Sequence, residues 1–483
     1  MRRFPAQELR EAIRESTASI AQFGDKPIDV RLLYIPKAHA RALHPDNFLV
    51  VGNRGAGKSL WWGALQSKEH RRRIAYALPD AAINVETDVS PGFGSKPDRT
   101  NYPGKDSFRQ LLEAGFEPRL IWRAIILRQL EAARARGPKR LDWKERAAWV
   151  KAHPAEVEEL LEKVDVDLQR QKQMKLFVFD ALDGTADDWK TLRQIVRGLF
   201  QVLLELRGYR ALRAKAFVRP DMVDDPEVEN FPDASKLRAG RVELEWSKLE
   251  LYNVLWQGMG NAARGKTFRD VCEELHQTWK KAHGIWTFPE GLRTDEDVQW
   301  KVFHGIAGDK MGAGQNKGYP YTWLPNHLAD AHGAVSPRSF VLALKTAADE
   351  TADDHRFALD REAIKRGVRE ASRGRRDEIK EDYPWLPEVM KPLVGLVIPG
   401  MKKDVKARWQ RASTIEQLKR LAREQGWLLP RRLSRRGADP DGLVEDLEEL
   451  GVFQVMSGGR INMPDVYRLQ FELKRKGGIP PVK

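Results

Sequence analysis

The chain has 483 residues, of which 41% are hydrophobic and 31% are charged, and its formal net charge is +14. A chain of this length is too long to fold around a single hydrophobic core, so we expect two to four domains. The chain has no run of eighteen apolar residues and no signal-peptide core at its start, and a single cysteine, Cys272, excludes a disulfide framework and a cysteine-rich zinc site. We therefore expect a soluble, cytoplasmic protein with no membrane partner.

The first expected elements are an amphipathic helix over Ala6–Gln22 and a short strand over Val30–Ile35. An apolar strand ending at Val51 then leads into a loop of the form G-x-x-x-x-G-K-S, and the start of a helix comes next. In such a loop, glycines let successive backbone N–H groups turn around a phosphate chain, and the helix N-terminus adds partial positive charge. This order of strand, loop and helix predicts a binding site for ATP or GTP.

The predicted loop assigns a role to each of its last two residues. Lys58 is expected to reach the β- and γ-phosphates, and the Ser59 hydroxyl to ligate Mg²⁺. The residues expected to contact the nucleotide are Gly52, Asn53, Arg54, Gly55, Ala56, Gly57, Lys58, Ser59 and Leu60. No N-K-x-D run typical of GTPases is present, which favours ATP.

Between the loop and the next strong strand lies a predicted helical block. A second strand is expected over Ala81–Val85, and the Gly-, Pro- and Asp-rich stretch Ser90–Pro103 is expected to be an exposed loop. The helices expected next are Ser107–Ala114, Glu117–Arg136 and Asp142–Leu168, the last divided at Pro154. We interpret this block, about residues 104–172, as an insertion into the nucleotide-binding domain.

The run Lys175–Asp180 is short, continuously apolar and ends in an acid, as in a central parallel strand. Because ligands bind at the carboxyl ends of such strands, Asp180 is predicted to hold the Mg²⁺ that Ser59 also ligates. Many P-loop ATPases place an acid directly after this aspartate to orient the attacking water, but here that residue is Ala181. Either Asp183 acts as the base, or turnover is slow and the nucleotide works mainly as a switch.

Further strands are expected over Ala214–Arg219 and Arg241–Trp246, and Ser247 begins a helix with a capping-box sequence. Arg219 is predicted either to sense the γ-phosphate or to pair with Asp221. Arg338, at the start of a later helix, is a candidate to reach the phosphates from a lid.

The C-terminal region is basic, with 18 Lys and Arg against 11 Asp and Glu from Met401 onward. Helices are expected over Thr414–Gln425 and Asp441–Leu450, and then a β-hairpin over Val452–Met463, as in a winged helix. The pairs Arg431-Arg432 and Arg435-Arg436 are candidates to bind the phosphates of double-stranded DNA. The predicted recognition helix is acidic, however, which favours protein contacts for this domain.

Together these elements predict an α/β fold: a P-loop NTPase parallel sheet with a helical insertion, a helical lid and a C-terminal winged-helix domain. The predicted division is a P-loop ATPase core over residues 1–260, a helical lid over 261–384 and the winged-helix-like domain over 385–483.

Several short motifs of the chain resemble the bacterial KAP/STAND-like P-loop ATPases, which are relatives of the AAA+ class. The motifs are Gly52–Ser59, Phe179–Asp183, Phe217–Asp221, Glu245–Ser247, Ser336–Arg338, and the closing segments Gly459–Arg468 and Lys474–Gly478. The resemblance implies a nucleotide-controlled switch that assembles with itself or with a partner, frequently in phage defence. Ala181 departs from the family pattern, and no long repeat array is present to act as a sensor.

These features are compatible with three functions. The first is a regulatory ATPase that binds Mg-ATP and switches a protein effector encoded nearby, with slow turnover and with homo-oligomer formation. The second is a DNA-binding ATPase that assists DNA partition or transposition, and the third is a scaffold that binds ATP without hydrolysing it. No second active site of the Ser/His/Asp, Cys/His or H-E-x-x-H type is apparent in the sequence.

Overall fold

In the computed structural model, residues 4–21, 28–133, 142–314, 317–436 and 439–475 are described, with side chains except at residues 19–21, 131–133 and 434–436. The chain divides into two compact units, one made of residues 24–30 and 35–245 and the other of residues 1–23, 31–34 and 246–483. We call them the P-loop unit and the helical unit.

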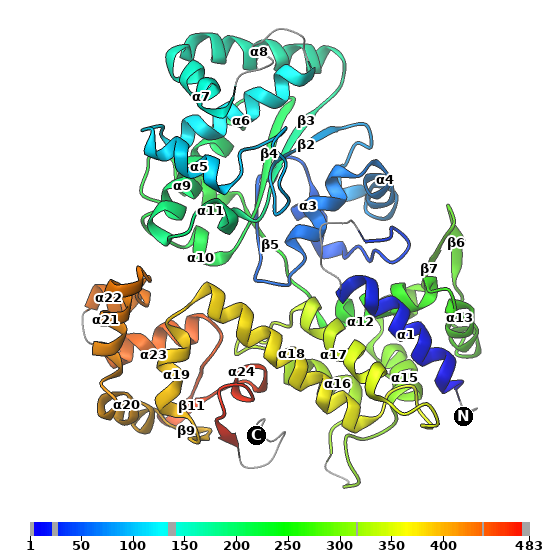
Figure 1. The fold of residues 1–483 in the computed structure, drawn as a ribbon. Helices are drawn as coiled ribbons and strands as arrows, with labels where there is room; N and C mark the ends of the chain where they lie inside the picture. The colour runs from blue at the N-terminus through cyan, green and yellow to red at the C-terminus, as the bar shows by residue number, and fades with distance from the viewer. Residues whose placement is uncertain (1–3, 22–27, 134–141, 315–316, 437–438, 476–483) are drawn as a thin grey trace. The chain divides into compact units, whose positions relative to one another are not determined.

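The P-loop unit is built on a five-stranded, all-parallel sheet in the order β2-β3-β4-β1-β5 (Figure 1). Its strands are β1 (Leu49–Val51), β2 (Asp88–Phe93), β3 (Lys175–Phe179), β4 (Leu212–Val218) and β5 (Arg241–Glu243). All residues of β1 and β3 are buried, which explains why both strands read as continuous apolar runs. The predicted α/β parallel sheet is confirmed.

Helices cover both faces of this sheet, with α3 and α4 on one face and α9 on the other (Figure 1). The helices of the unit are α2 (Ala40–Leu43), α3 (Lys58–Gln66), α4 (Lys68–Ala77), α5 (Lys105–Glu113), α6 (Pro118–Ala133), α7 (Trp143–Ala152), α8 (Pro154–Arg170), α9 (Trp189–Leu206), α10 (Pro220–Val223) and α11 (Ser235–Ala239), with short 3₁₀ turns η1 (Lys37–His39), η2 (Pro79–Ala81) and η3 (Leu182–Thr185).

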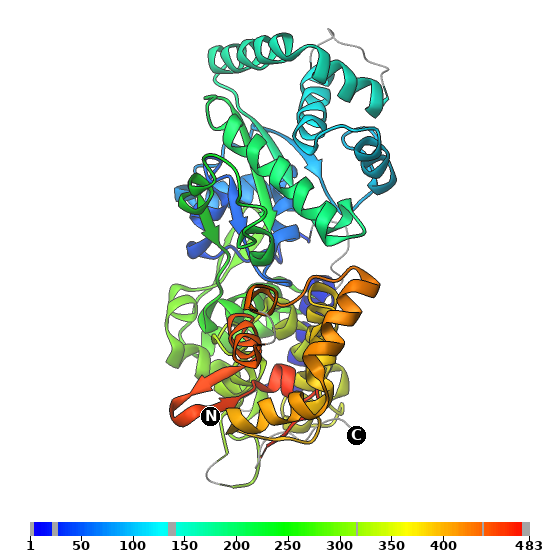
Figure 2. The same cartoon turned by 90° about the vertical axis from the view of Figure 1, so that its left-hand side faces the viewer.

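The helical insertion lies between β2 and β3 and consists of α5 to α8, with α7 and α8 gathered at one end of the unit (Figure 2). As expected, Pro154 divides the last long helix, since proline is tolerated in the first turn of a helix but not in its interior. Trp122 of α6 fixes the insertion to the sheet: its ring packs edge-on against Phe179, and its Nε1 donates to the Ile195 carbonyl at 2.9 Å.

One strand prediction and part of one loop prediction in this region are wrong. Ala81–Val85 forms no strand, and the real second strand is β2, whose last four residues overlap the start of the stretch expected to be a loop. Pro91 and Gly92 disfavour a strand, yet β2 lies at the edge of the sheet, where a missing N–H donor is tolerated. At Gly92 a Cβ atom would lie 2.1 Å from the Phe179 ring, so only glycine fits there.

The predicted strand over Val30–Ile35 is also wrong, because this buried segment is irregular. One of its carbonyls, that of Arg31, accepts a hydrogen bond from the side-chain amide of Gln257 at 2.8 Å.

The helical unit contains the N-terminal helix and all elements after residue 246. Its helices are α1 (Ala6–Ala21), α12 (Lys248–Asn261), α13 (Gly265–Glu274), α14 (Glu290–Thr294), α15 (Glu296–Ala307), α16 (Pro320–Leu328), α17 (Pro337–Glu350), α18 (Arg361–Asp382), α19 (Leu386–Met390), α20 (Lys402–Arg411), α21 (Thr414–Gln425), α22 (Arg431–Arg436), α23 (Pro440–Glu449) and α24 (Asp465–Arg468), with a 3₁₀ turn η4 (Lys391–Leu393).

Helix α12 begins with the predicted capping box and packs against α1 and α17. The sequence predicted a domain boundary after residue 260, whereas the two units divide between residues 245 and 246. Helix α12, which lies between these two positions, belongs to the helical unit. Cys272 is buried, and burial raises the pKa of its thiol to about 12.

The C-terminal part of this unit is a winged-helix domain, as predicted. Helices α20, α21 and α23 lie in sequence between β9 and β10, and the sheet is three-stranded and antiparallel in the order β10-β11-β9. The strands of the helical unit are β6 (Lys280–Ala282), β7 (Ile285–Thr287), β8 (Val397–Ile398), β9 (Gly400–Met401), β10 (Gln454–Met456), β11 (Arg460–Asn462) and β12 (Lys474–Arg475), with a 3₁₀ turn η5 (Ser457–Gly459). Residues 476–478 of the closing motif lie outside the described residues.

Candidate functional site

The glycine-rich loop connects the end of β1 directly to α3. Gly55 and Gly57 have φ angles of 76° and 98°, a left-handed region that glycine adopts without a Cβ penalty. At Gly52 a Cβ atom would lie 3.1 Å from Ala56 Cβ and 3.3 Å from Leu244 Cβ. The loop is therefore wound tightly over the carboxyl edge of the sheet, where parallel α/β folds bind ligands.

Lys58, the first residue of α3, folds back over this loop. Its Nζ donates to the Gly52 carbonyl at 2.7 Å and to the Asn53 carbonyl at 3.0 Å. Both acceptors belong to the loop itself, so the ammonium group is held above the loop at the N-terminus of α3. This position suits a lysine that contacts the β- and γ-phosphates of a nucleotide.

Asp180 lies at the end of β3, and its side chain meets Ser59. The residue is 3% exposed, and the Ser59 side chain lies close enough to the Asp180 carboxylate to favour its charged form. Burial raises the pKa of Asp180, although Ser59 and the nearby Lys58 charge act in the opposite direction. A buried carboxylate of this kind is stabilised by a cation, and hydroxyl and carboxylate oxygens are the ligands that Mg²⁺ prefers.

The two predicted metal-side residues, Ser59 and Asp180, are thus brought together by the fold. Among the described residues, no group of three or more His, Cys, Asp or Glu is placed to hold a metal ion. A magnesium ion at Ser59 and Asp180 would therefore take its remaining ligands from phosphate oxygens and water, as is usual for Mg²⁺ bound with a nucleotide.

The chain turns sharply after Asp180. Ala181 has a φ of 54°, a left-handed conformation that is uncommon for residues other than glycine. The turn leads into η3, which carries Asp183, a residue with 42% of its side chain exposed. Backbone strain of this kind is concentrated at ligand and switch sites, where the surrounding structure holds it in place.

Asp183 is held between two arginines from different elements. Its Oδ2 lies 3.3 Å from an Nη of Arg54, in the glycine-rich loop, and 3.4 Å from an Nη of Arg219, which comes directly after β4. The carboxylate therefore connects the phosphate loop to the next strand of the sheet. This arrangement fixes the position of Asp183 beside the glycine-rich loop.

Arg219 makes the structural pair that was one of its two predicted roles. Its Nε and Nη2 donate to the two carboxylate oxygens of Asp221 at 3.0 and 2.9 Å, and its guanidinium lies 5.5 Å from the Trp189 ring centroid. A bidentate pair of this geometry orients the guanidinium firmly. Arg219 thus stays at the same edge of the sheet as Asp180 and Asp183.

Arg338 belongs to the helical unit, where its Nη1 pairs with Glu378 of α18 at 2.7 Å. This contact occupies the guanidinium within its own unit. The predicted role of Arg338 as a residue that reaches the phosphates stays a prediction.

A buried histidine supports the helix that carries Lys58. Trp61 of α3 donates from Nε1 to His39 Nδ1 at 3.2 Å, and His39 Nε2 lies 3.0 Å from the Glu245 carbonyl. Because Nδ1 accepts, the proton of the neutral ring is on Nε2, which donates to Glu245. Burial lowers the pKa of His39 to about 4, so the ring is neutral at pH 7.

This pKa predicts acid sensitivity of the P-loop unit. His39 takes up a proton near pH 6.5 in the unfolded chain but only near pH 4 in the folded one, so stability falls as the pH drops from 6.5 toward 4. Between pH 7.5 and 5 we expect a loss of about 2 kcal/mol from this group. Urea unfolding at the two pH values measures it. His39→Gln should reduce this difference and His44→Gln should leave it; an unchanged difference in His39→Gln would contradict the assignment.

The sequence indicated Arg54 only as a loop residue, and it gave no sign of Trp189 or of the contact between Arg54 and Asp183. These residues meet because the strand order places the ends of β1, β3 and β4 side by side. A local sequence pattern does not show which strand ends are neighbours. These contacts could be predicted only together with the strand order of the sheet.

Four basic residues of the winged helix pair with its own acidic helix, α23 (Lys402, Lys406, Arg431 and Arg432). Asp441 of α23 contacts Lys402 at 2.6 Å and Lys406 at 2.7 Å. Arg432 pairs with Asp446 at 3.0 Å and Glu449 at 2.6 Å. Arg431 also pairs with Glu449, at 3.3 Å. The pair Arg431-Arg432 is therefore engaged within the domain, while the side chains of Arg435 and Arg436 lie outside the described ones.

Comparisons with known proteins give a weak structural likeness only. No protein-family model matches the chain, and no curated protein matches it either. The structure is similar to the Aeropyrum pernix ORC2 protein in ADPNP-ADP complexes, with 12% identity, 92% of this chain and 93% of that chain covered, and a TM-score of 0.33. The ADP form of that protein gives the same identity and coverage with a TM-score of 0.34.

Cdc6p from Pyrobaculum aerophilum is similar at 11% identity, with 87% of this chain and 83% of that chain covered and a TM-score of 0.30. Likenesses this weak carry no argument about activity, and the resemblance to KAP/STAND-like ATPases stays a prediction. Within the described ranges, no helix has both the length and the hydrophobicity that crossing a membrane requires.

Proposed function

We propose that this protein is a regulatory ATPase that binds Mg-ATP at the loop Gly52–Ser59 and uses the bound nucleotide as a switch. The observation that carries the proposal is that the buried Asp180 carboxylate lies beside Ser59 and Lys58, whose ammonium group is held over the glycine-rich loop at the N-terminus of α3. In this proposal, Ser59 and Asp180 would supply two oxygen ligands for Mg²⁺, and Lys58 would supply an ammonium group for the phosphates. The sheet order also fits the AAA+-related class that the sequence resembles.

The residues directly after Asp180 support a switch. Ala181 cannot act as a base, and the nearest acid, Asp183, is paired with Arg54 and Arg219. A γ-phosphate would compete with Asp183 for these arginines, since guanidinium groups bind phosphate and carboxylate alike. Binding and release of the γ-phosphate would then be transmitted to η3 and to the end of β4.

If Asp183 is the catalytic base, Asp183→Asn is expected to lower the rate of ATP turnover by at least about 100-fold, because a positioned base contributes that much. The affinity for Mg-ATP should change far less, since the asparagine retains the size of the side chain. Steady-state phosphate release and a binding titration measure the two quantities. Asp187→Asn is the control, because Asp187 pairs with Lys105 and Arg109 of the insertion. Normal turnover in Asp183→Asn would show that Asp183 is not the base.

A DNA-coupled ATPase is the second candidate, and the formal charge of +14 is the observation that favours it. Arg431 and Arg432 pair with Glu449 and Asp446 of the same domain, which disfavours DNA binding by this part of the winged helix. Turnover measured with and without double-stranded DNA, at two salt concentrations, separates the candidates. Salt-sensitive stimulation by DNA supports the DNA-coupled ATPase, and turnover that DNA does not change supports a switch that acts on a protein.

A protein effector encoded nearby, homo-oligomer formation, a lid around Arg338 and a role in phage defence derive from the sequence and its resemblance alone. They remain predictions of this proposal.

A further inference from the structure

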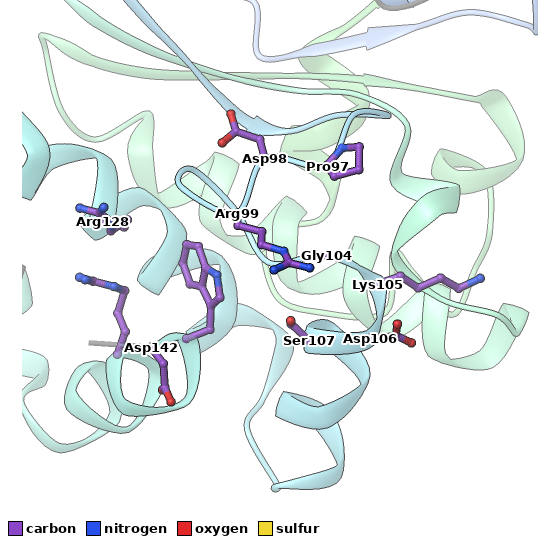
Figure 3. A pocket seen from close by; sticks show the side chains of 11 residues that line it. Pro97, Asp98, Arg99, Gly104, Lys105, Asp106, Ser107, Arg128 and Asp142 are labelled. Carbon is purple, nitrogen blue, oxygen red and sulfur yellow. The ribbon is translucent and has the colours of Figure 1, made fainter. Parts of the chain in front are cut away.

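The helical insertion contains a cavity of about 570 Å³ that the proposed ATPase function does not use (Figure 3). It is lined by Pro97, Asp98, Arg99, Gly104, Lys105, Asp106, Ser107, Arg128, Asp142, Trp143 and Arg146. These residues come from the segment before α5, from the first turn of α5, from α6 and from the start of α7. None belongs to the loop Gly52–Ser59, so the cavity is separate from the nucleotide site. Its volume is within the range of small-molecule sites.

The three carboxylates of the lining already have partners nearby. Asp98 accepts hydrogen bonds from the backbone of Thr100 and, at 2.6 Å, from the side chain of Asn101. Asp106 pairs with Arg109 at 2.5 Å. Asp142 caps α7 by accepting from the Glu145 N–H at 2.8 Å. These contacts hold each carboxylate in place on its own segment.

The cations of the lining are not equivalent. Lys105 pairs with Asp187, beyond η3. Arg99 and Arg128, by contrast, have no ion-pair partner in the part of the chain that the structure describes, and Arg128 is partly buried. In Figure 3, Lys105 and Arg128 lie at opposite ends of the lining with Arg99 between them. Arg99 is exposed, and both guanidinium groups can pair with an anion bound in the cavity.

The remaining lining residues complete a site for a phosphorylated molecule. Buried Arg146 also lines the cavity, Ser107 offers a hydroxyl donor, and the half-buried Trp143 offers a flat apolar wall. Guanidinium groups bind phosphate through paired hydrogen bonds, and indole rings stack on planar rings. We propose that this cavity binds a phosphorylated small molecule, with Arg99 and Arg128 on the phosphate and Trp143 against the rest of the ligand.

Two sources share this phosphate chemistry, a nucleotide and an inorganic oligophosphate. The experiment therefore uses ATP and pyrophosphate as separate probes, each titrated calorimetrically into the full-length Lys58→Ala protein in EDTA, where the magnesium-dependent site does not contribute. We expect one binding event. Tighter binding of ATP than of pyrophosphate would identify a nucleotide site in which Trp143 contacts the base, and equal binding would identify an oligophosphate site.

Arg128→Gln, added to Lys58→Ala, should weaken this binding by about tenfold or more, because it removes a charge-assisted contact to phosphate. Arg170→Gln is the matched control: Arg170 is an exposed arginine of the same insertion, with 77% of its side chain accessible, and it does not line the cavity. Urea unfolding confirms that each variant is folded. If neither probe binds the Lys58→Ala protein at millimolar concentration, or if binding is the same after Arg128→Gln, the proposal is wrong.

Discussion

Lys58→Ala is expected to weaken magnesium-dependent ATP binding by at least about 100-fold. The ammonium group that now donates to the Gly52 and Asn53 carbonyls is the charge that would meet the β- and γ-phosphates. Charged hydrogen bonds contribute about 1.5–3 kcal/mol each, and every 1.4 kcal/mol is tenfold in affinity. Calorimetric titration of ATP in the presence of Mg²⁺ measures the change.

The control for this variant is Lys68→Ala, which removes an exposed lysine of the next helix that pairs with Glu86 at 2.7 Å. It should bind Mg-ATP like the wild-type protein. A Lys58→Ala protein with wild-type affinity would mean that the glycine-rich loop does not bind the phosphates.

Asp180→Asn is expected to lower ATP turnover without lowering the stability of the nucleotide-free protein. Because burial raises the pKa of Asp180, its charge is destabilising at neutral pH in the protein without a ligand. The neutral amide keeps a hydrogen-bonding group beside Ser59 without that charge. We therefore expect the variant to be at least as stable as the wild-type protein in the absence of nucleotide, yet to lose a ligand of Mg²⁺ and about 100-fold or more of turnover.

Urea unfolding without ligand and phosphate release with Mg-ATP test both halves of this expectation. Asp233→Asn, at an aspartate with 63% of its side chain exposed, is the control and should change neither quantity much. A destabilised Asp180→Asn protein that still turns over ATP would place the metal elsewhere.

Buried strands and helices with clear caps were predictable from the sequence because their signals are local. The runs that became β1 and β3 are apolar since both faces of the sheet are covered, and the capping box at Ser247 marked the start of α12. Strand β2 was missed because an edge strand tolerates Pro91 and Gly92. A strand was wrongly predicted over Val30–Ile35, because a buried apolar segment without regular structure has the same sequence pattern as a buried strand.

In the candidate site, too, the local patterns were predictable from the sequence and the contacts between distant segments were not. Gly52–Ser59 and Asp180 were identified because a phosphate loop and a strand-terminal acid are local patterns. The contacts of Asp183 with Arg54 and Arg219 join three segments that are distant in sequence. They depend on the strand order, and so does the meeting of Ser59 with Asp180. The pairing of Arg431 and Arg432 with α23 likewise required the folded domain.

The central claim is that Lys58, Ser59 and Asp180 form a Mg-ATP site, and the thermal unfolding midpoint of the wild-type protein tests it most directly. A ligand at 100 times its Kd stabilises the folded state by about 2.7 kcal/mol, which corresponds to a shift of several degrees. We predict that Mg-ATP raises the midpoint clearly more than ATP with EDTA, and that Lys58→Ala abolishes this difference. An equal midpoint with Mg-ATP, with ATP in EDTA and without nucleotide would contradict the account.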